Sequence, residues 1–254
     1  MRDGSSSRCA PRSAAALVAL ALAGCGGGQA RPHEPPEPHG HDLTPVTEAA
    51  PARPDGRWLT ARVRDRVALR AAPRASARVL ARLGRRTEFG SPLVLGVLRR
   101  RDGWLAVGAP QLPNGRTGWI PEQAAELRGT DLAVHVDLSA RRLELRDGRR
   151  VLRHMPVAVG RPDNPTPLGR YAVTDRLHTN RTDSPYGCCA IALTGHQTDL
   201  PAGWPGGDRL AIHATPQAET IGEAASLGCL RAPTRGIRAL MRRLALGTPV
   251  FVRR

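Results

Sequence analysis

The chain is organised around Leu210-Ala211-Ile212-His213-Ala214-Thr215 and Ser226-Leu227-Gly228-Cys229-Leu230-Arg231, in which Cys229 follows His213 by sixteen positions. The apolar run that ends at His213 predicts a strand, and the small residues before Cys229 predict a tight loop whose backbone amides converge. A cysteine with a histidine elsewhere is a candidate nucleophile and base, because the thiolate attacks and needs a partner to form it. An unrelated cysteine and histidine would give the same pattern, so the rest of the sequence must indicate whether this pair is catalytic.

Composition limits the possible classes. The 254 residues are 41% hydrophobic, which suits one or two globular domains, and only 3% aromatic, so the cores must consist of Ala, Val, Leu and Ile. The net charge is +16 and all 38 basic residues are arginines. This charge fits attraction to an anionic surface such as cell wall or phospholipid, or else a compositional bias spread over solvated faces. No basic stripe interleaved with aromatics occurs, so we expect no nucleic-acid partner.

Residues 1–24 predict an export signal. Arg2, Arg8 and Arg12 precede a short apolar run, Ala14 to Ala23, which is too short to span a bilayer. The run ends in Leu22-Ala23-Gly24-Cys25, which looks like a lipobox. A lipidated Cys25 would anchor an exported chain to the outer side of a bacterial membrane, facing periplasm or cell wall. The alternative is an ordinary cleaved signal peptide with a chance cysteine.

Residues 25–56 are predicted to be a lipidated linker rich in Pro, Gly and His, with almost nothing apolar to bury. His33, His39 and His41 could bind a metal weakly, but their spacing fixes no coordination geometry. We therefore predict no metal site and no cofactor.

Residues 57–128 carry short apolar runs separated by turns such as Asp102-Gly103 and Asn114-Gly115, which predicts a small all-β barrel. The stretches Val-Ala-Leu-Arg-Ala-Ala-Pro (67–73), Gly-Trp-Leu (103–105) and Gly-Trp-Ile-Pro (118–121) resemble a bacterial SH3-like domain. That resemblance implies wall-peptide binding. A barrel that only positions the next domain is the alternative.

Residues 131–254 predict a second, mainly β domain. Val134, Val136 and Leu138 alternate with polar residues, and so does the run 142–146, which is typical of a hairpin. Further strands are expected at 156–160, 171–174, 190–193 and 210–213. A helix capped by Thr234 should follow Cys229, with a last strand at 249–252. The predicted fold class is mainly β, with one short helix after the loop that carries the nucleophile.

Five blocks of this second domain resemble, in order, the catalytic domain of the L,D-transpeptidases. They read Val-Asp-Leu-Ser, Val-Gly, Thr-Pro-Leu-Gly, Ile-His-Ala-Thr and Ser-Leu-Gly-Cys-Leu-Arg, and they lie between residue 131 and the C-terminus. The resemblance implies cleavage of the bond between diaminopimelate and D-Ala in peptidoglycan tetrapeptide stems. The acyl group then passes to an amine of another stem, which makes a 3-3 cross-link.

Carried over to this chain, the resemblance makes Cys229 the nucleophile, His213 the base and the Ala214 carbonyl the group that orients the imidazole. The turn itself suggests an oxyanion hole from the backbone amides of Leu227, Gly228 and Cys229. Ser226 and Arg231 are candidate substrate contacts, and Arg231 could pair with a stem carboxylate or be an ordinary surface arginine.

The chain departs from the family at Leu227, where a second histidine usually stands. The backbone amide survives this change, but an imidazole near the thiol is lost. Three functions stay open: a transpeptidase, a carboxypeptidase or hydrolase on the same stems, and a non-catalytic wall-binding lipoprotein.

Cys188 and Cys189 are adjacent in the sequence. We expect buried free thiols, one on each face of a strand. A vicinal disulfide or a metal site is the alternative.

Overall fold

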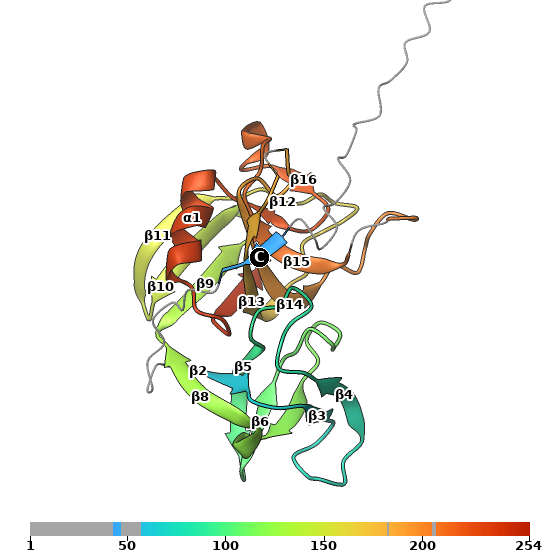
Figure 1. Ribbon diagram of the computed structural model, residues 1–254. Helices are drawn as coiled ribbons and strands as arrows, with labels where there is room; N and C mark the ends of the chain where they lie inside the picture. The colour runs from blue at the N-terminus through green and yellow to red at the C-terminus, as the bar shows by residue number, and fades with distance from the viewer. Residues whose placement is uncertain (1–42, 47–56, 182, 205–206) are drawn as a thin grey trace, which may run out of the picture. The chain divides into compact units, whose positions relative to one another are not determined.

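The computed structural model describes residues 43–46, 57–181, 183–204 and 207–254 (Figure 1). The chain divides into Met1–Glu34 and Pro35–Arg254, and all the described residues belong to the second unit. The predicted signal peptide and Cys25 therefore lie outside the described residues. Across those residues, no helix is both long and apolar enough to cross a membrane.

The N-terminal sheet has seven strands in the order β4-β3-β7-β6-β5-β2-β8. Their bounds are β2 Trp58–Val63, β3 Val67–Arg70, β4 Val79–Leu83, β5 Val94–Arg101, β6 Trp104–Val107, β7 Gly118–Pro121 and β8 Ala125–Thr130. The turn between β5 and β6 has positive φ at Asp102 (48°) and Gly103 (74°), as an Asp-Gly hairpin turn requires. A β domain was predicted here and the strands are present, while its SH3-like character stays a prediction.

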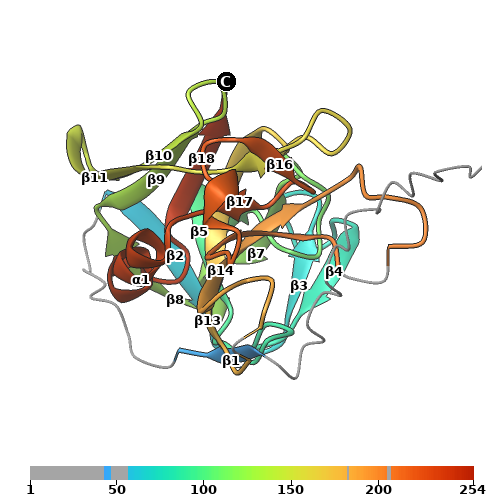
Figure 2. The ribbon, with the colours of Figure 1, turned by 90° about the horizontal axis from the view of Figure 1, so that it is seen from above.

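The C-terminal sheet has the order β11-β10-β9-β18-β13-β14-β15-β17, and β1 also pairs with β13 (Figures 1 and 2). The strands are β1 Leu43–Pro45, β9 Leu132–Asp137, β10 Arg142–Asp147, β11 Arg150–Pro156, β13 Gly169–Thr179, β14 Cys189–His196, β15 Arg209–His213, β17 Leu230–Arg231 and β18 Pro249–Arg253. Strands β12 Val159–Gly160 and β16 Ala224–Ser226 form a separate parallel pair. The predicted mainly β fold is confirmed.

Helix α1, Thr234–Arg243, is the one α-helix in the described residues. Its apolar residues Ile237, Leu240 and Met241 join the core of the C-terminal sheet, and the buried Arg176 of β13 donates to the Met241 carbonyl at 2.7 Å. The predicted cap was wrong, because Thr234 is the first helical residue and no side chain caps this end.

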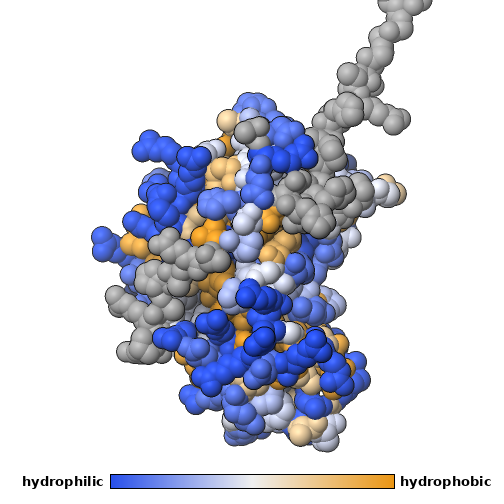
Figure 3. Space-filling model, in the orientation of Figure 1, coloured by the Kyte–Doolittle hydropathy of each residue, from blue (hydrophilic) through white to orange (hydrophobic). Residues whose placement is uncertain are grey.

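Each sheet has its own apolar core, and polar side chains join the two. The Thr87 hydroxyl donates to the buried carboxylate of Asp175 at 2.5 Å, and Arg209 pairs with Glu88 at 2.6 Å. Outward-facing residues are largely hydrophilic on the face drawn in Figure 3. The N-terminal sheet is thus fixed to the sheet that carries His213 and Cys229.

Two local predictions need correction. Leu43–Pro45, inside the predicted linker, forms β1 and pairs with residues 177–179 of β13, because β13 extends beyond the predicted 171–174 and offers a free edge there. The strand expected at 156–160 is also displaced: β11 ends at Pro156, since the Asp147-Gly148 turn returns the chain directly against β10, and only Val159–Gly160 of the expected range forms a strand, β12.

Candidate active site

His213 ends β15 and is 5% exposed. Its Nδ1 lies 2.6 Å from the carbonyl oxygen of Ala214. A carbonyl only accepts hydrogen bonds, so Nδ1 carries the proton and Nε2 carries the lone pair. The ring is therefore held in the tautomer that a general base needs.

Burial lowers the pKa of His213 to about 4, because a charged imidazolium loses its hydration there. The hydrogen bond to Ala214 raises this pKa, and the nearby Arg231 guanidinium lowers it further. The imidazole is consequently neutral near pH 7 and can accept a proton.

Cys229 directly precedes β17, which runs parallel to β15 with Leu230 beside Ile212 and Arg231 beside His213. Cys229 itself lies in the bend that leads into β17, one residue before the paired register begins. The thiol is partly exposed, and its Sγ lies 3.8 Å from the Arg209 carbonyl oxygen. The fold thus brings the end of β15, which carries His213, beside β17, which directly follows Cys229.

Ser226 shapes the loop before the cysteine. Its hydroxyl accepts the Gly228 N–H at 3.0 Å and donates to the Cys229 carbonyl at 2.6 Å, and the residue is only 2% exposed. Ser226 therefore contacts its own loop here. The Gly228 amide is engaged within the loop, whereas the oxyanion-hole roles expected of the Leu227 and Cys229 amides stay predictions.

Two side chains from outside this loop donate hydrogen bonds to its backbone carbonyls, and the sequence predicted neither role. The Gln197 amide donates to the Leu227 carbonyl at 2.7 Å and is nearly buried. The Thr166 hydroxyl donates to the Gly228 carbonyl at 2.8 Å. Thr166 belongs to the Thr-Pro-Leu-Gly block, whereas nothing in the sequence distinguishes Gln197.

Gly228 fits against Gln197 so closely that a Cβ would collide with the Gln197 amide nitrogen. Its φ is +120°, a backbone conformation that residues other than glycine rarely adopt. The loop therefore requires glycine at this position for both conformation and space.

The segment before β14 packs against the histidine. The Tyr186 ring meets the His213 ring edge-on, with centroids 4.9 Å apart and planes at 90°. Gly187 lies against Ala214, so that a Cβ on it would come within 2.7 Å of the Ala214 Cβ. This packing contributes to the burial of the imidazole. The sequence did not predict a role for Tyr186.

The expected free thiols at Cys188 and Cys189 are corrected, because a disulfide joins these adjacent residues. Cys189 is fully buried and Cys188 partly so, and the short separation along the chain leaves both sulfurs within bonding reach. Cys229 takes no part in a disulfide.

The N-terminal sheet reaches this site through His196, the residue before Gln197. Asn114 donates to the His196 carbonyl at 2.6 Å and accepts its N–H at 2.8 Å. The His196 ring lies between the Asp208 carboxylate, 2.9 Å from Nδ1, and the Pro110 carbonyl, 2.7 Å from Nε2. In the described ranges, no three His, Cys, Asp or Glu side chains cluster as metal ligands would.

Residues 131–252 match the family model of the L,D-transpeptidase catalytic domain, YkuD. This stretch contains His213, Cys229 and the loop between β16 and β17.

Two curated relatives are YkuD proteins. That of Bacillus licheniformis is 27% identical over 119 residues, which are 47% of this chain and 64% of the relative. That of Bacillus subtilis is 26% identical over 121 residues, 48% of this chain and 65% of the relative. The match spans less than two thirds of the length of either relative.

Similar solved structures include the L,D-transpeptidase LdtMt1 in complex with imipenem, at 18% identity and a TM-score of 0.41, over 63% of this chain and 90% of that one. An L,D-transpeptidase from Mycobacterium smegmatis is 13% identical with a TM-score of 0.40, over 84% of this chain and 99% of that one.

Proposed function

We propose that the chain is a cysteine-dependent acyltransferase that acts on peptidoglycan stem peptides as an L,D-transpeptidase. The observation that carries this proposal is the position of His213, fixed through Nδ1 by the Ala214 carbonyl at the end of β15, next to β17, the strand that directly follows Cys229. The match of residues 131–252 to the L,D-transpeptidase catalytic domain supports the substrate class.

The first half-reaction forms a thioester. His213 Nε2 takes the thiol proton as Cys229 Sγ attacks the carbonyl carbon of the diaminopimelate–D-Ala bond. The amides of Leu227 and Cys229 stabilise the oxyanion. When the C–N bond breaks, the imidazolium returns its proton to the departing amine of D-Ala.

The second half-reaction transfers the acyl group. An amine of another stem attacks the thioester and gives its proton to His213. The C–S bond then breaks, a new amide forms and the thiolate regains the proton. If water takes the place of the amine, the same steps give a carboxypeptidase.

The low pKa of His213 fits a proton transfer that accompanies the attack. A charged imidazolium is costly in this buried position, so a resting pair of thiolate and imidazolium is disfavoured. The base is thus available across the neutral range without first losing a proton.

Turnover of a purified disaccharide-tetrapeptide tests the proposal. With a second stem as acceptor, muropeptide analysis should show a 3-3 cross-linked dimer and released D-Ala, and the Cys229→Ala variant should give neither. Tripeptide without dimer would favour the hydrolase. If neither the dimer nor the tripeptide forms, the result would favour a non-catalytic wall-binding protein.

We further propose that Cys25 carries a lipid anchor and that the N-terminal sheet is an SH3-like domain. The lipobox-like Leu22-Ala23-Gly24-Cys25 supports the anchor. Cys25→Ala should move the protein from the membrane to the soluble fraction, and a variant that stays lipid-bound would contradict it.

A further inference from the structure

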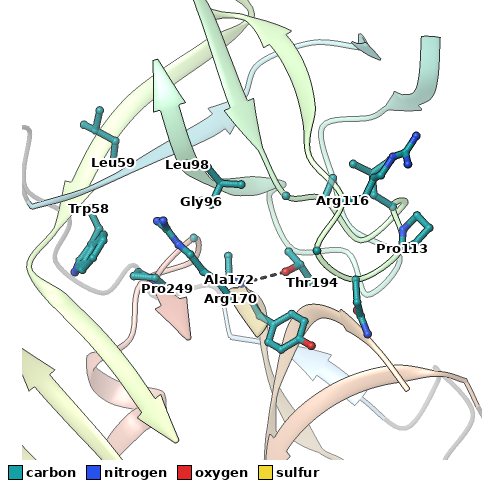
Figure 4. A pocket seen from close by; sticks show the side chains of 17 residues that line it. Trp58, Leu59, Gly96, Leu98, Pro113, Arg116, Arg170, Ala172, Thr194 and Pro249 are labelled. Atoms are coloured by element: carbon teal, nitrogen blue, oxygen red, sulfur yellow. Dashed lines mark hydrogen bonds between the residues drawn. The ribbon is translucent and has the colours of Figure 1, made fainter. Parts of the chain in front are cut away.

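A cavity of about 200 Å³ lies where the N-terminal sheet meets the C-terminal sheet (Figure 4). From the first sheet it is lined by Trp58 and Leu98 and by the loop between β6 and β7. From the second it is lined by Arg170 and Ala172 of β13, with Thr194 and Pro249. The cavity includes neither His213 nor Cys229, so it is separate from the candidate active site.

The walls of this cavity are mainly apolar, and no Asp or Glu is among its lining residues. Its two charged side chains are both arginines, Arg170 and Arg116. In Figure 4, Arg170 extends between Trp58 and Leu98, whereas Arg116 lies at the opposite end. The cavity thus combines apolar surface with uncompensated positive charge, which favours an anionic ligand.

Arg170 is held in place by aromatic rings. Its guanidinium carbon lies 5.2 Å from the centroid of Trp58 and 5.5 Å from that of Phe251. The Arg170 guanidinium donates one long hydrogen bond, 3.4 Å, to the Val97 carbonyl. Among the described residues, Arg170 forms no salt bridge with a carboxylate. These cation–π contacts use none of the N–H donors of the guanidinium, which can therefore bind a ligand.

We propose that this cavity binds a carboxylate carried on a small apolar body, such as the C-terminal end of a short peptide, with Arg170 as its counter-charge. A planar guanidinium can hold both carboxylate oxygens at once. Because liquid water occupies about 30 Å³ per molecule, the volume equals roughly six or seven waters. One or two alanine-sized residues fit that space, and Leu98, Ala172 and Pro249 offer contacts for their methyl groups.

NMR on the full-length protein tests this site directly. The Trp58 indole N–H, assigned from the Trp58→Phe spectrum, is followed while N-acetyl-D-Ala-D-Ala is added. We expect a saturable shift, and binding of the C-terminal amide of the same peptide should be at least roughly tenfold weaker, because it lacks the charge. In Cys229→Ala the binding should persist, which separates this site from the proposed chemistry.

Variants of Arg170 distinguish the charge from the packing. Arg170→Gln should weaken binding at least roughly tenfold, and Arg170→Lys should give an intermediate loss, since it keeps charge without the planar fork. Arg150→Gln, an exposed arginine of β11, is the matched control and should bind normally. Both Arg170 variants retain a long side chain, and their spectra report whether the fold is kept.

Several outcomes would overturn the proposal. Equal binding of acid and amide, unchanged binding by Arg170→Gln, or equally strong displacement by inorganic phosphate would each do so. Comparing N-acetyl-D-Ala-D-Ala with its L,L counterpart then identifies the source of the ligand. A preference for the D,D form points to wall peptides, and equal binding points to any peptide end.

Discussion

The Nδ1 atom of His213 lies 2.6 Å from the carbonyl oxygen of Ala214, the next residue in the chain. This contact fixes the imidazole tautomer with one backbone group, whereas in a catalytic triad an acidic side chain orients the base. Burial lowers the pKa of His213 because a charged imidazolium loses its hydration, and the hydrogen bond to the neutral Ala214 carbonyl offsets only part of this effect. The low pKa of His213, about 4, is the measurable consequence.

The pH dependence of acylation should reflect this value. The base works only when neutral, so the His213 contribution should hold from pH 8 down to about 5 and fall as pH approaches 4. The rate of modification of Cys229 by meropenem across pH measures it. A half-loss near 6.5, the ordinary value for histidine, would contradict a buried imidazole.

Stability should depend on pH in the same region. The folded-state pKa of His213 lies below its unfolded value of about 6.5, so the unfolded chain binds more protons between about 6.5 and 4. The contribution of His213 to the free energy of unfolding is therefore complete above that window and is lost as pH falls through it. Denaturant unfolding should show a smaller loss from pH 7 to 5 in His213→Gln than in the unmodified protein.

Tyr186 should control that pKa through its ring. Tyr186→Ala opens the edge-on contact to water, which should raise the pKa of His213 and move the acid limb of acylation upward. Tyr186→Phe keeps the ring and is the matched control. If both variants leave the acid limb unchanged, the ring does not contribute to burial of the imidazole.

Gln197 should position the nucleophile loop. Gln197→Ala leaves the Leu227 carbonyl without its donor, so we expect a loss of about 1–3 kcal/mol in the free energy of unfolding. Displacement of the loop should slow acylation by on the order of 10–100-fold. The free energy of unfolding and the acylation rate are both measured well below the melting temperature. The control variant is Gln123→Ala, which changes an exposed glutamine. Lower stability with normal acylation would assign Gln197 a purely structural role.

Asn114 should connect the N-terminal sheet to this loop, because its amide binds both backbone groups of His196 next to Gln197. Asn114→Ala should lower the free energy of unfolding by about 1–3 kcal/mol and slow acylation in the same direction as Gln197→Ala. Asn180→Ala is the control, because the Asn180 amide oxygen accepts a hydrogen bond from the exposed Thr44 hydroxyl, away from His196. Unchanged acylation in Asn114→Ala would mean that the sheet does not support the loop.

Local patterns in the sequence predict much of this fold. Alternating residues identified β9 and β10, and the Asp102-Gly103 pair identified a hairpin turn, because both depend on neighbours along the chain. The pair His213 and Cys229 also came from local patterns. The roles of Gln197 and Tyr186 depend instead on loops that approach each other only in the fold. The Cys188–Cys189 bond was missed because alternation predicts opposite faces for adjacent residues.

Intact-protein mass spectrometry after meropenem treatment tests the central claim, that Cys229 is an activated nucleophile with His213 as its base. We predict one stable adduct on the unmodified protein, none on Cys229→Ala, and strongly slowed formation on His213→Gln. An adduct that persists in Cys229→Ala, or no adduct on the folded unmodified protein, would contradict it.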